Sequence, residues 1–407
     1  MFYILFHNLF ETLKRLTVSD ELKTNEIPYP EDRESLFNWF EEMIRSPLNM
    51  LMEKAIQDGA LPIGYTCSYI PRVILSVKPF VPYRIFAPGV SSTEMADTYL
   101  PSTLCSYTRS MLEFAINGGY DFLRGWVLAS SCQHMNRFFD NLKHAVTLPF
   151  AHLVDLPHRT GDSARKWMAD ELHELIRTMS DHFKIAITDQ HLHESIERHN
   201  GVSKILLDIS EMRKKSASPL SGADFHKLMM ASLVTPQDLI VEPLNAIKKR
   251  LQESNAATGD FRARLVLVGG QLDNPAFIDA IEQAGGLVVA DRICTGSIPG
   301  LDPYPNDGDP VERIASHILT KTSCPRMMDA FQERLSAIID TYENYRADGI
   351  VIEAIKFCDT WGLEARELSD SLRQRGIPVL KLEREYRHTG EGQLRTRVQA
   401  FIESMGK

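Results

Sequence analysis

The chain has few cysteines and lacks the features that define several common classes of protein. Only 6 of its 407 residues are cysteine, too few for a scaffold held together by disulfides. Basic charge is not in excess: 45 Lys and Arg stand against 54 Asp and Glu, a net charge of −9 that argues against nonspecific nucleic-acid binding. Hydrophobic residues make up 43% and charged residues 24%, a globular mixture that excludes collagen, coiled coils and disordered chains.

Long hydrophobic runs are also missing. No stretch approaches the roughly 18 apolar residues that a membrane-spanning helix needs. The apolar start, MFYILFHNLFETLKRL, has no basic segment before it and no small-residue cleavage site after it, so we expect a short amphipathic helix. These absences predict a cytoplasmic protein with neither membrane nor nucleic acid as a partner, whose cysteines are ligands or free thiols.

The sequence does contain two series of apolar runs that alternate with helical patterns. Four strands are predicted between residues 61 and 154, in LPIGYT, YRIFAP, GWVLAS and VTLPFAHLV. Four more are predicted between residues 263 and 383, in ARLVLVGG, GGLVVAD, DGIVIEA and IPVLKLE. Such Val/Ile/Leu-rich runs are typical of parallel strands covered on both faces, and the alternation indicates βαβ units.

The predicted fold is therefore α/β, with two Rossmann- or flavodoxin-like parallel-sheet domains joined by a helical segment and preceded by a helical extension. Residues 34–56 show the apolar spacing of a helix, and residues 163–254 are almost wholly helical in pattern. The predicted boundaries are 1–60 for the N-terminal helical extension, 61–162 for the first α/β domain, 163–260 for the helical connector and 261–407 for the second α/β domain.

The six cysteines fall at the ends of these predicted elements. Four of them follow a predicted strand: Cys67, Cys132, Cys294 and Cys358. The other two, Cys105 and Cys324, lie near predicted helix starts, where free N–H groups favour a thiolate. The carboxyl ends of the strands are the ligand-binding edge of an open α/β sheet. The positions therefore favour a cysteine-ligated group at these edges, three cysteines coming from each domain.

The residues leave open what the cysteines do. Each one alone could be a buried, inert thiol, as in a binding or scaffold protein. No two are spaced as the C-x₂₋₄-C pair of a zinc site, whereas thiolates gathered from distant loops suit an iron–sulfur cluster between two domains. Two sets of three would leave one iron of each four-iron cubane without a protein thiolate, and that iron could take a small substrate, water or a bridging sulfide.

Motifs for other chemistry are absent or weak. The chain contains no GxxxxGK[ST] phosphate loop, no HExxH and no GxSxG. His134 lies two residues after Cys132, and Lys356 lies two residues before Cys358. Both are candidate proton donors beside a cluster, with a role in the surroundings of the site or on the surface as the alternative for each.

An ordered set of motifs resembles one protein family. The segments GYTCSYIPRVIL, LPSTLCSYTRS, SSCQHMNR, GGLVVADRICTGS, CPRM, ADGIVIEAIKFCD and GQLRTRVQAFIE occur in this order. Together they resemble the family of 2-hydroxyacyl-CoA dehydratase and benzoyl-CoA reductase cluster subunits, from about Ile63 onward. The resemblance implies that Cys105, Cys132 and Cys358 correspond to the three cysteines that hold one [4Fe-4S] cluster in such subunits. Gln133 and His134 depart from the acidic and small residues expected there.

The additional Cys67, Cys294 and Cys324 resemble the double-cubane cluster branch of that family. This resemblance implies a double-cubane [8Fe-9S] cluster on all six cysteines, a homodimer, and an ATP-hydrolysing iron–sulfur reductase as partner. The implied activity is ATP-dependent reduction of a small molecule. The alternative is a 2-hydroxyacyl-CoA dehydratase or benzoyl-CoA reductase subunit, with a single [4Fe-4S] cluster and a CoA thioester as substrate.

The family resemblance also bears on how the thiolates divide between two cubanes. By analogy with the dehydratases, Cys105, Cys132 and Cys358 share one cubane, which leaves Cys67, Cys294 and Cys324 for the other. A division by domain is the competing assignment.

Overall fold

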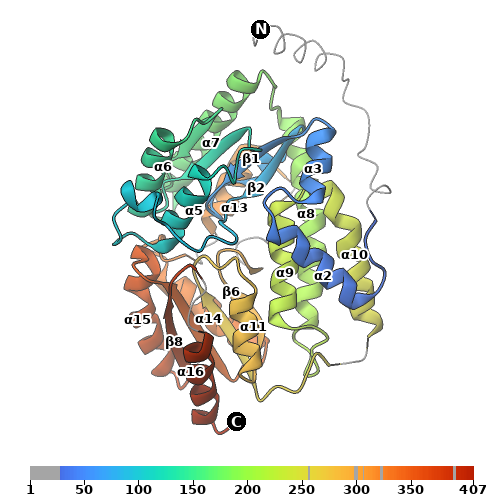
Figure 1. Cartoon of the computed structure of the whole chain (residues 1–407), viewed down its shortest axis with the longest axis vertical. Coiled ribbons are helices and arrows are strands. Elements are labelled where there is room, and N and C mark those ends of the chain that lie inside the picture. Colours follow the sequence, from blue (N-terminus) through green and yellow to red (C-terminus); the bar gives the residue numbers. More distant parts are fainter. Residues whose placement is uncertain (1–27, 255–256, 298–300, 306, 321–323, 388–390) are drawn as a thin grey trace.

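The eight predicted strands form two four-stranded parallel sheets in a computed structural model of the chain (Figure 1). The structure describes residues 28–254, 257–297, 301–305, 307–320, 324–387 and 391–407. The first sheet has the order β2-β1-β3-β4. Its strands are β1 (Leu61–Tyr65), β2 (Phe80–Arg84), β3 (Gly125–Ala129) and β4 (Ala151–Val154).

The second sheet has the equivalent order, β6-β5-β7-β8. Its strands are β5 (Ala263–Gly269), β6 (Gly286–Arg292), β7 (Gly349–Ile355) and β8 (Val379–Arg384). In each sheet the strand order reverses between two neighbouring strands, β1 and β3 or β5 and β7, which is where open α/β sheets bind ligands. The predicted fold class, two parallel-sheet units of the doubly wound type, is confirmed.

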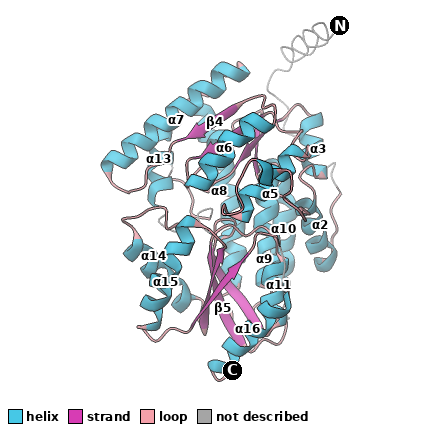
Figure 2. Cartoon of the chain, turned by 60° about the vertical axis from the view of Figure 1, so that its left-hand side comes forward, coloured by secondary structure: helices cyan, strands magenta, loops and turns pink. Residues whose placement is uncertain are grey.

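Helices cover both faces of each sheet, as the two-sided burial of the strands requires. Around the second sheet, α14 and α15 lie on one side and α11 and α16 on the other (Figure 2). The helices next to the first sheet are α4 (Arg72–Leu75), α5 (Ser106–Ile116), α6 (Gln133–Ala145) and α7 (Asp162–Phe183). Those next to the second are α11 (Ala276–Gln283), α14 (Phe331–Asn344), α15 (Asp359–Arg373) and α16 (Glu391–Ser404). We call each sheet with its helices a lobe, the first and the second.

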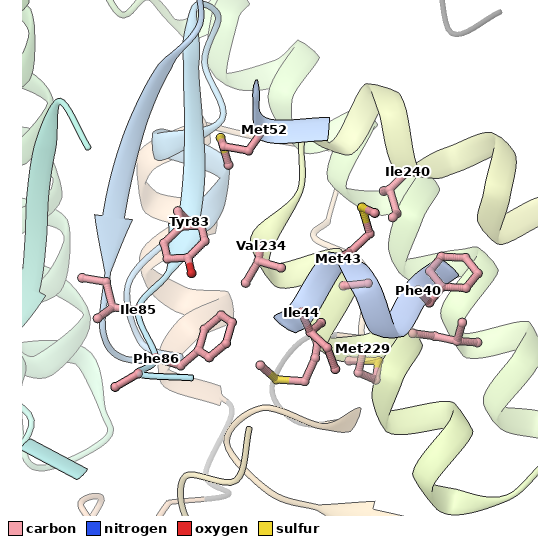
Figure 3. Close-up of a cluster of buried hydrophobic side chains, with 14 of the residues drawn as sticks. Phe40, Met43, Ile44, Met52, Tyr83, Ile85, Phe86, Met229, Val234 and Ile240 are labelled. Atoms are coloured by element: carbon pink, nitrogen blue, oxygen red, sulfur yellow. The ribbon is translucent and has the colours of Figure 1, made fainter. Parts of the chain in front are cut away.

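Three helices run beside both lobes and carry a shared core. They are α8 (Asp189–Met212), α9 (Gly222–Val234) and α10 (Gln237–Glu253), and with α7 they fill the region predicted as helical. Two helices before β1, α2 (Arg33–Arg45) and α3 (Met50–Gln57), pack against this group. In Figure 3, Phe40, Met43 and Ile44 of α2 approach Met229 of α9 and Ile240 of α10. The apolar face of α2 thus closes the core between the first sheet and the connector.

One helix crosses from the second half of the sequence to the first lobe. Helix α13 (Pro310–Thr320) follows β6 in the chain, yet it packs against α7, and its label lies among the first-lobe elements in Figure 1. Its buried residues Val311, Ile314 and Ile318 belong to the same apolar cluster as Ile63 and Val127 of the first sheet. The chain then returns to the second lobe through Cys324 and α14.

Several predicted elements differ in their bounds. The strand predicted at 83–88 is found at Phe80–Arg84 and so includes Pro82. Proline has no N–H to donate, but it is tolerated here because β2 lies at the edge of the sheet, where one side of the strand needs no hydrogen bonds. The strand predicted at 146–154 is reduced to Ala151–Val154, also at an edge. The single helix predicted over 34–56 is two helices, because Asn49 caps α3 by accepting a hydrogen bond from Met52 N–H at 3.0 Å. The amphipathic helix predicted at the start of the chain lies outside the described residues.

Within the part of the chain that the structure describes, no helix combines the length and apolar character that crossing a bilayer demands.

A buried carboxylate joins the connector to the second sheet. Glu282, at the end of α11, accepts hydrogen bonds from Gly222 N–H at 2.7 Å and Val288 N–H at 3.1 Å through one oxygen. Its other oxygen accepts from Ala223 N–H at 3.2 Å. Burial raises the pKa of Glu282 to about 7, although the three backbone bonds oppose the shift. The start of α9 is therefore anchored by a group that titrates near neutrality.

We expect Glu282 to make stability depend on pH. Because its folded-state pKa lies above the value of 4.5 for an exposed glutamate, its contribution is fully present below about pH 4.5 and is lost as the pH rises through about 7. The Glu282→Gln variant should lack this dependence. The difference in unfolding free energy, wild type minus variant, should fall by up to about 3 kcal/mol between pH 4.5 and 8. Urea unfolding at several pH values measures it, and parallel profiles for the two proteins would contradict the assignment.

Candidate functional site

Four cysteines lie just past the carboxyl ends of strands, as predicted. Cys67 follows β1 and Cys132 follows β3, the two strands between which the order of the first sheet reverses. Cys358 follows β7, which occupies the equivalent position in the second sheet, and Cys294 follows β6. Both sheets therefore present cysteines at the edge where ligands bind in this class of fold.

Helix starts carry three of the six cysteines. Cys105, Cys132 and Cys358 are the N-cap residues of α5, α6 and α15. The prediction for Cys105 is thus confirmed, whereas that for Cys324 is wrong. Cys324 lies in a turn in which its carbonyl accepts a hydrogen bond from Met327 N–H at 3.0 Å, and α14 begins only at Phe331. Pro325 favours the second position of such a turn, so the chain turns here before the helix starts.

The ligand-binding edges of the two lobes face each other and are joined by hydrogen bonds. The Ser68 hydroxyl, next to Cys67, donates to the carbonyl of Cys294 at 2.5 Å. Tyr386, after β8, donates its N–H to the Ser106 hydroxyl at 2.8 Å, beside Cys105. These bonds cross from lobe to lobe and bring the surroundings of Cys67, Cys105 and Cys294 together at the interface.

The side chain of Tyr386 also joins the two lobes. The Tyr386 hydroxyl accepts a hydrogen bond from Ala87 N–H of the first lobe at 2.9 Å and donates to the Asp273 carboxylate of the second. Burial raises the pKa of Asp273, and the Tyr386 hydrogen bond opposes that shift. The hydroxyl therefore satisfies two buried groups that would otherwise lack partners on opposite sides of the interface.

Electrostatic interactions link the thiols to one another. Burial raises the pKa of Cys132 to about 12, and charge on Cys105 and Cys358 adds to the shift. Burial also raises the pKa of Cys294 well above its usual value, with added effects from Cys324 and Cys67 and a smaller one from Cys358. Cys105 and Cys358 thus affect Cys132, Cys324 and Cys67 affect Cys294, and Cys358 also affects Cys294 and Cys324.

The buried thiols are poor free nucleophiles. Burial raises the pKa of Cys105 to about 11 and that of Cys324 to about 12. Because only the thiolate attacks substrates, thiols with these pKa values are almost wholly unreactive at neutral pH. A metal removes the proton on binding and so overcomes the same penalty. The surroundings therefore favour ligation over nucleophilic catalysis.

Two buried arginines lie among the thiols. Arg326 donates to the carbonyls of Ser131, at 2.9 Å, and Leu156, both in the first lobe. Burial lowers its pKa, while Cys67, Cys324 and Cys132 oppose that shift. Arg334 donates to the carbonyl of Cys324 at 3.1 Å and pairs with the Glu364 carboxylate. Positive charge beside this thiol region would stabilise thiolates and any anionic group that they bind.

Hydroxyl groups approach two of the thiols. The Thr108 oxygen lies 3.6 Å from Cys105 Sγ, and the Thr360 oxygen lies 3.5 Å from Cys358 Sγ. Phe357, next to Cys358, adopts a φ of 64°, a left-handed conformation that is rare for a side chain of this size. The backbone is strained at the turn that places Cys358, as is common at functional sites.

The two predicted proton donors differ in their surroundings. His134 is buried, and its Nδ1 accepts a hydrogen bond from Cys105 N–H at 3.2 Å. Its Nε2 lies 3.5 Å from the Asp359 carboxylate, so the ring connects the starts of α5, α6 and α15. Lys356 is exposed, with its ammonium 5.3 Å from the centre of the Phe357 ring. Proton donation by either residue stays a prediction.

Charged residues inside strands were missed by the sequence reasoning. Glu353 is fully buried in β7, where it pairs with Arg384 Nε at 2.8 Å and accepts a hydrogen bond from Gly270 N–H at 2.9 Å. Gly269 is required here, because a Cβ would lie only 2.5 Å from the Glu353 carbonyl oxygen. A single Glu within the apolar run GIVIEAI is the signal that identifies such a residue.

The donor set fits a cluster better than a single ion. Across the described ranges, no three His, Cys, Asp or Glu side chains are grouped closely enough to hold one metal ion. The irons of a cubane lie at separate corners, so its thiolate ligands are farther apart than those of a single ion. Thiols with a buried arginine nearby are donors of the kind that iron–sulfur clusters take.

The fold and the site define a two-lobed parallel α/β protein with cysteines at the facing edges of its sheets. Residues 67–405 match the model of the family "2-hydroxyglutaryl-CoA dehydratase, D-component". The chain belongs to that family, as its motifs predict.

Relatives with assigned names are enzyme subunits. The chain is 22% identical over 375 residues to the (R)-phenyllactyl-CoA dehydratase beta subunit of Clostridium sporogenes, covering 91% of this chain and 99% of that protein. It is 23% identical to a benzoyl-CoA reductase subunit of Thauera aromatica, covering 78% and 84%. It is 21% identical to the (R)-2-hydroxyglutaryl-CoA dehydratase beta subunit of Acidaminococcus fermentans, covering 91% and 99%. The chain is thus a member of a family of dehydratase and reductase subunits.

We expect His134 to hold Cys105 through its ring nitrogen. His134→Ala should lower the free energy of unfolding by about 1–3 kcal/mol, because it leaves the buried Cys105 N–H without an acceptor. His134→Asn should recover most of this loss, since its amide oxygen can take the place of Nδ1. Denaturant unfolding measures both, with His173→Ala on the exposed face of α7 as the control.

The same pair of variants separates positioning from proton donation. Asn cannot donate a proton as histidine does, so a stable His134→Asn protein that loses turnover would support the predicted donor role. Equal losses of stability in the Asn and Ala variants would contradict the positioning role.

Proposed function

We propose that this chain is the iron–sulfur reductase component of an ATP-dependent oxidoreductase and that its six cysteines hold a double-cubane [8Fe-9S] cluster. The observation that carries the proposal is that four cysteines follow strands at the facing edges of two parallel sheets, Cys67, Cys132, Cys294 and Cys358. Cys105 and Cys324 are linked electrostatically to Cys358 of this group. A single four-iron cluster with three protein ligands would leave three of these thiols without a function. When bound, a double cubane supplies electrons at low potential for the reduction of a small molecule.

The protein's own residues would bind and shield this cluster. Cys105, Cys132 and Cys358 would ligate one cubane, and Cys67, Cys294 and Cys324 the other, which agrees with the electrostatic grouping of the thiols. Cys358 interacts with thiols of both sets, consistent with two cubanes that adjoin at its position.

The remaining groups would tune the site. Thr360 is placed to donate a hydrogen bond to the sulfur of Cys358, whereas the Thr108 hydroxyl donates to the Cys105 carbonyl at 2.9 Å. Arg326 supplies positive charge, while the charge of Arg334 is paired with Glu364. Such contacts stabilise the more reduced, more negative form of a cluster and so raise its potential. His134 and Lys356 are the proposed proton donors.

The proposed partner is an ATP-hydrolysing iron–sulfur reductase that acts as activator and electron donor. The chain has no phosphate-loop motif of its own, which agrees with ATP being used by the partner. We propose in addition that the chain forms a homodimer and works in the cytoplasm. Membrane and nucleic acid are not proposed as partners.

A second candidate function is a lyase subunit, of the 2-hydroxyacyl-CoA dehydratase or benzoyl-CoA reductase type, with a single [4Fe-4S] cluster. The observation in its favour is that two of the named relatives, matched over 99% of their own length, are dehydratase beta subunits. On this alternative only Cys105, Cys132 and Cys358, the three helix N-caps, would bind iron.

Iron and acid-labile sulfide analysis of anaerobically purified protein distinguishes these functions. We expect about eight irons per chain for the double cubane, against about four for the alternative. A colourless protein that takes up no iron on anaerobic reconstitution would contradict both and favour a scaffold with buried thiols.

Single Cys→Ser variants test the ligand sets. Under the proposal, Cys294→Ser and Cys132→Ser should each lose roughly half or more of the iron, because each removes a ligand of one cubane. Under the alternative, Cys132→Ser should lose all the iron while Cys294→Ser keeps it all. Circular dichroism of each variant checks that the fold persists, and Ser163→Ala, on the exposed start of α7, is a control that keeps every thiol.

A further inference from the structure

A pocket lies between the first sheet and the connector helices and reaches one of the thiols. Its cavity volume is about 50 Å³, and residues of β1, β2, α8 and α9 line it. Cys294 and Ser68, which join the two lobes through a hydrogen bond, also line it. The volume has room for a ligand of a few heavy atoms and not for a large one.

Two buried polar groups facing this pocket lack hydrogen-bond partners. Tyr65 and Arg84 pair in register across β1 and β2, and the Arg84 guanidinium lies 5.5 Å from the centre of the Tyr65 ring. Tyr65 is 1% exposed and Arg84 3%. Among the described residues, neither the Tyr65 hydroxyl nor Arg84 Nε has a partner. Because buried polar groups are almost always paired, these two indicate a missing ligand or water.

The positively charged arginines that line the pocket favour the binding of an anion. Among the described residues, Arg84 donates to two neutral groups, the Ser68 hydroxyl at 3.2 Å and the Gln271 amide oxygen at 2.9 Å. Arg72, which also lines the pocket, donates to the Ser232 carbonyl at 2.6 Å, and its Nε has no partner in the described part of the chain. The described lining includes these two arginines and no Asp or Glu. Unpaired guanidinium groups with spare N–H donors are the usual protein ligands of carboxylates and other oxyanions.

Apolar side chains complete the pocket on the side of the connector. Val202, Leu206 and Met229 line it together with the arginines. Apolar walls exclude water and strengthen the attraction between a buried guanidinium and an anion. The ligand that fits this combination is small, carries one negative charge and offers acceptor atoms to Arg84 and Tyr65.

We propose that this pocket binds a small monovalent anion, such as a carboxylate or an inorganic oxyanion, beside Cys294. Arg84 and Arg72 hold its charge, and the Tyr65 hydroxyl donates a hydrogen bond to it. The inference rests on the proposed function in one respect, since an anion held here is a substrate only if the thiol region carries a cluster. Anion binding itself depends only on the pocket.

Anion binding is tested with bromide in crystals and with carbon-13-labelled formate in solution, both on the iron-loaded protein. Anomalous scattering should locate a bromide between Arg84, Arg72 and Tyr65. Nuclear magnetic resonance titration should give saturable formate binding that Arg84→Gln weakens at least tenfold and Arg84→Lys weakens less. Bromide that occupies only other sites, or formate binding unchanged in Arg84→Gln, would overturn the proposal.

A pair of tyrosine variants provides the matched control. Tyr83 precedes Arg84 in β2, is fully buried, and also has a hydroxyl without a partner in the described residues, but it does not line the pocket. It points instead into the core that Figure 3 shows. Tyr65→Phe should weaken formate binding several-fold and Tyr83→Phe should not change it. Equal effects of the two substitutions would contradict the role of Tyr65.

Iron content and thermal unfolding of each variant separate this inference from its alternatives. If Arg84 only balances thiolate charge, Arg84→Gln will lose iron while formate binding stays, which overturns the pocket proposal. A wild-type protein with eight irons and no formate binding refutes the pocket alone. A protein with four irons and bromide in the pocket refutes only the double cubane.

Discussion

The hydroxyl of Tyr386 connects the two lobes at the point on which the candidate site depends. It accepts from a backbone N–H of the first lobe and donates to the buried Asp273 of the second, so both groups are satisfied only while the lobes stay in register. An unsatisfied buried donor or carboxylate costs several kcal/mol, which makes this arrangement much more stable than a slipped one. The backbone of the same tyrosine binds Ser106, so the position of Cys105 follows from the same contact.

Placing thiols at this interface has an energetic cost that a ligand can reverse. Burial raises the pKa of Cys105, Cys132 and Cys324, so in the absence of metal these groups are held as neutral thiols. The arginines around them are also buried, and burial lowers the pKa of Arg326. Opposite charges introduced together would offset both penalties. The site is thus arranged for a bound anionic group to stabilise the lobe interface as well as to carry chemistry.

Features that depend on a local sequence pattern, the strands and the cysteines that follow them, could be predicted from the sequence. The eight strands were predictable because each is an apolar run with a turn or helix on either side, and the strand-end cysteines followed from them. Pro82 made the position of β2 harder to predict, because proline in a strand depends on which strand lies at the edge. Cys324 was misplaced because its turn is set by Pro325 rather than by the helix that follows.

Contacts between distant segments could not be predicted in this way. Arg326 binds the carbonyls of Ser131 and Leu156, and Ser68 binds the carbonyl of Cys294. The partners in these pairs are 170 to 226 residues apart in the sequence. No spacing in a single sequence encodes such pairs. Glu353 could be recognised in the sequence, because a single carboxylate in an apolar strand needs a buried partner. That this partner is Arg384 could be known only from the sheet order, which places β8 beside β7.

The crossing of α13 to the first lobe has a consequence for motion. Two lobes joined by a single linker can rotate apart about a hinge, whereas here the chain passes from the first lobe through the connector to the second and returns with α13 to the first. If α13 moved with the second lobe in such a rotation, Val311, Ile314 and Ile318 would leave the first-lobe core. Exposing each of these side chains costs roughly 1.5–3 kcal/mol. At that cost α13 stays with the first lobe, and any separation of the lobes has to be taken up in all three segments that connect them.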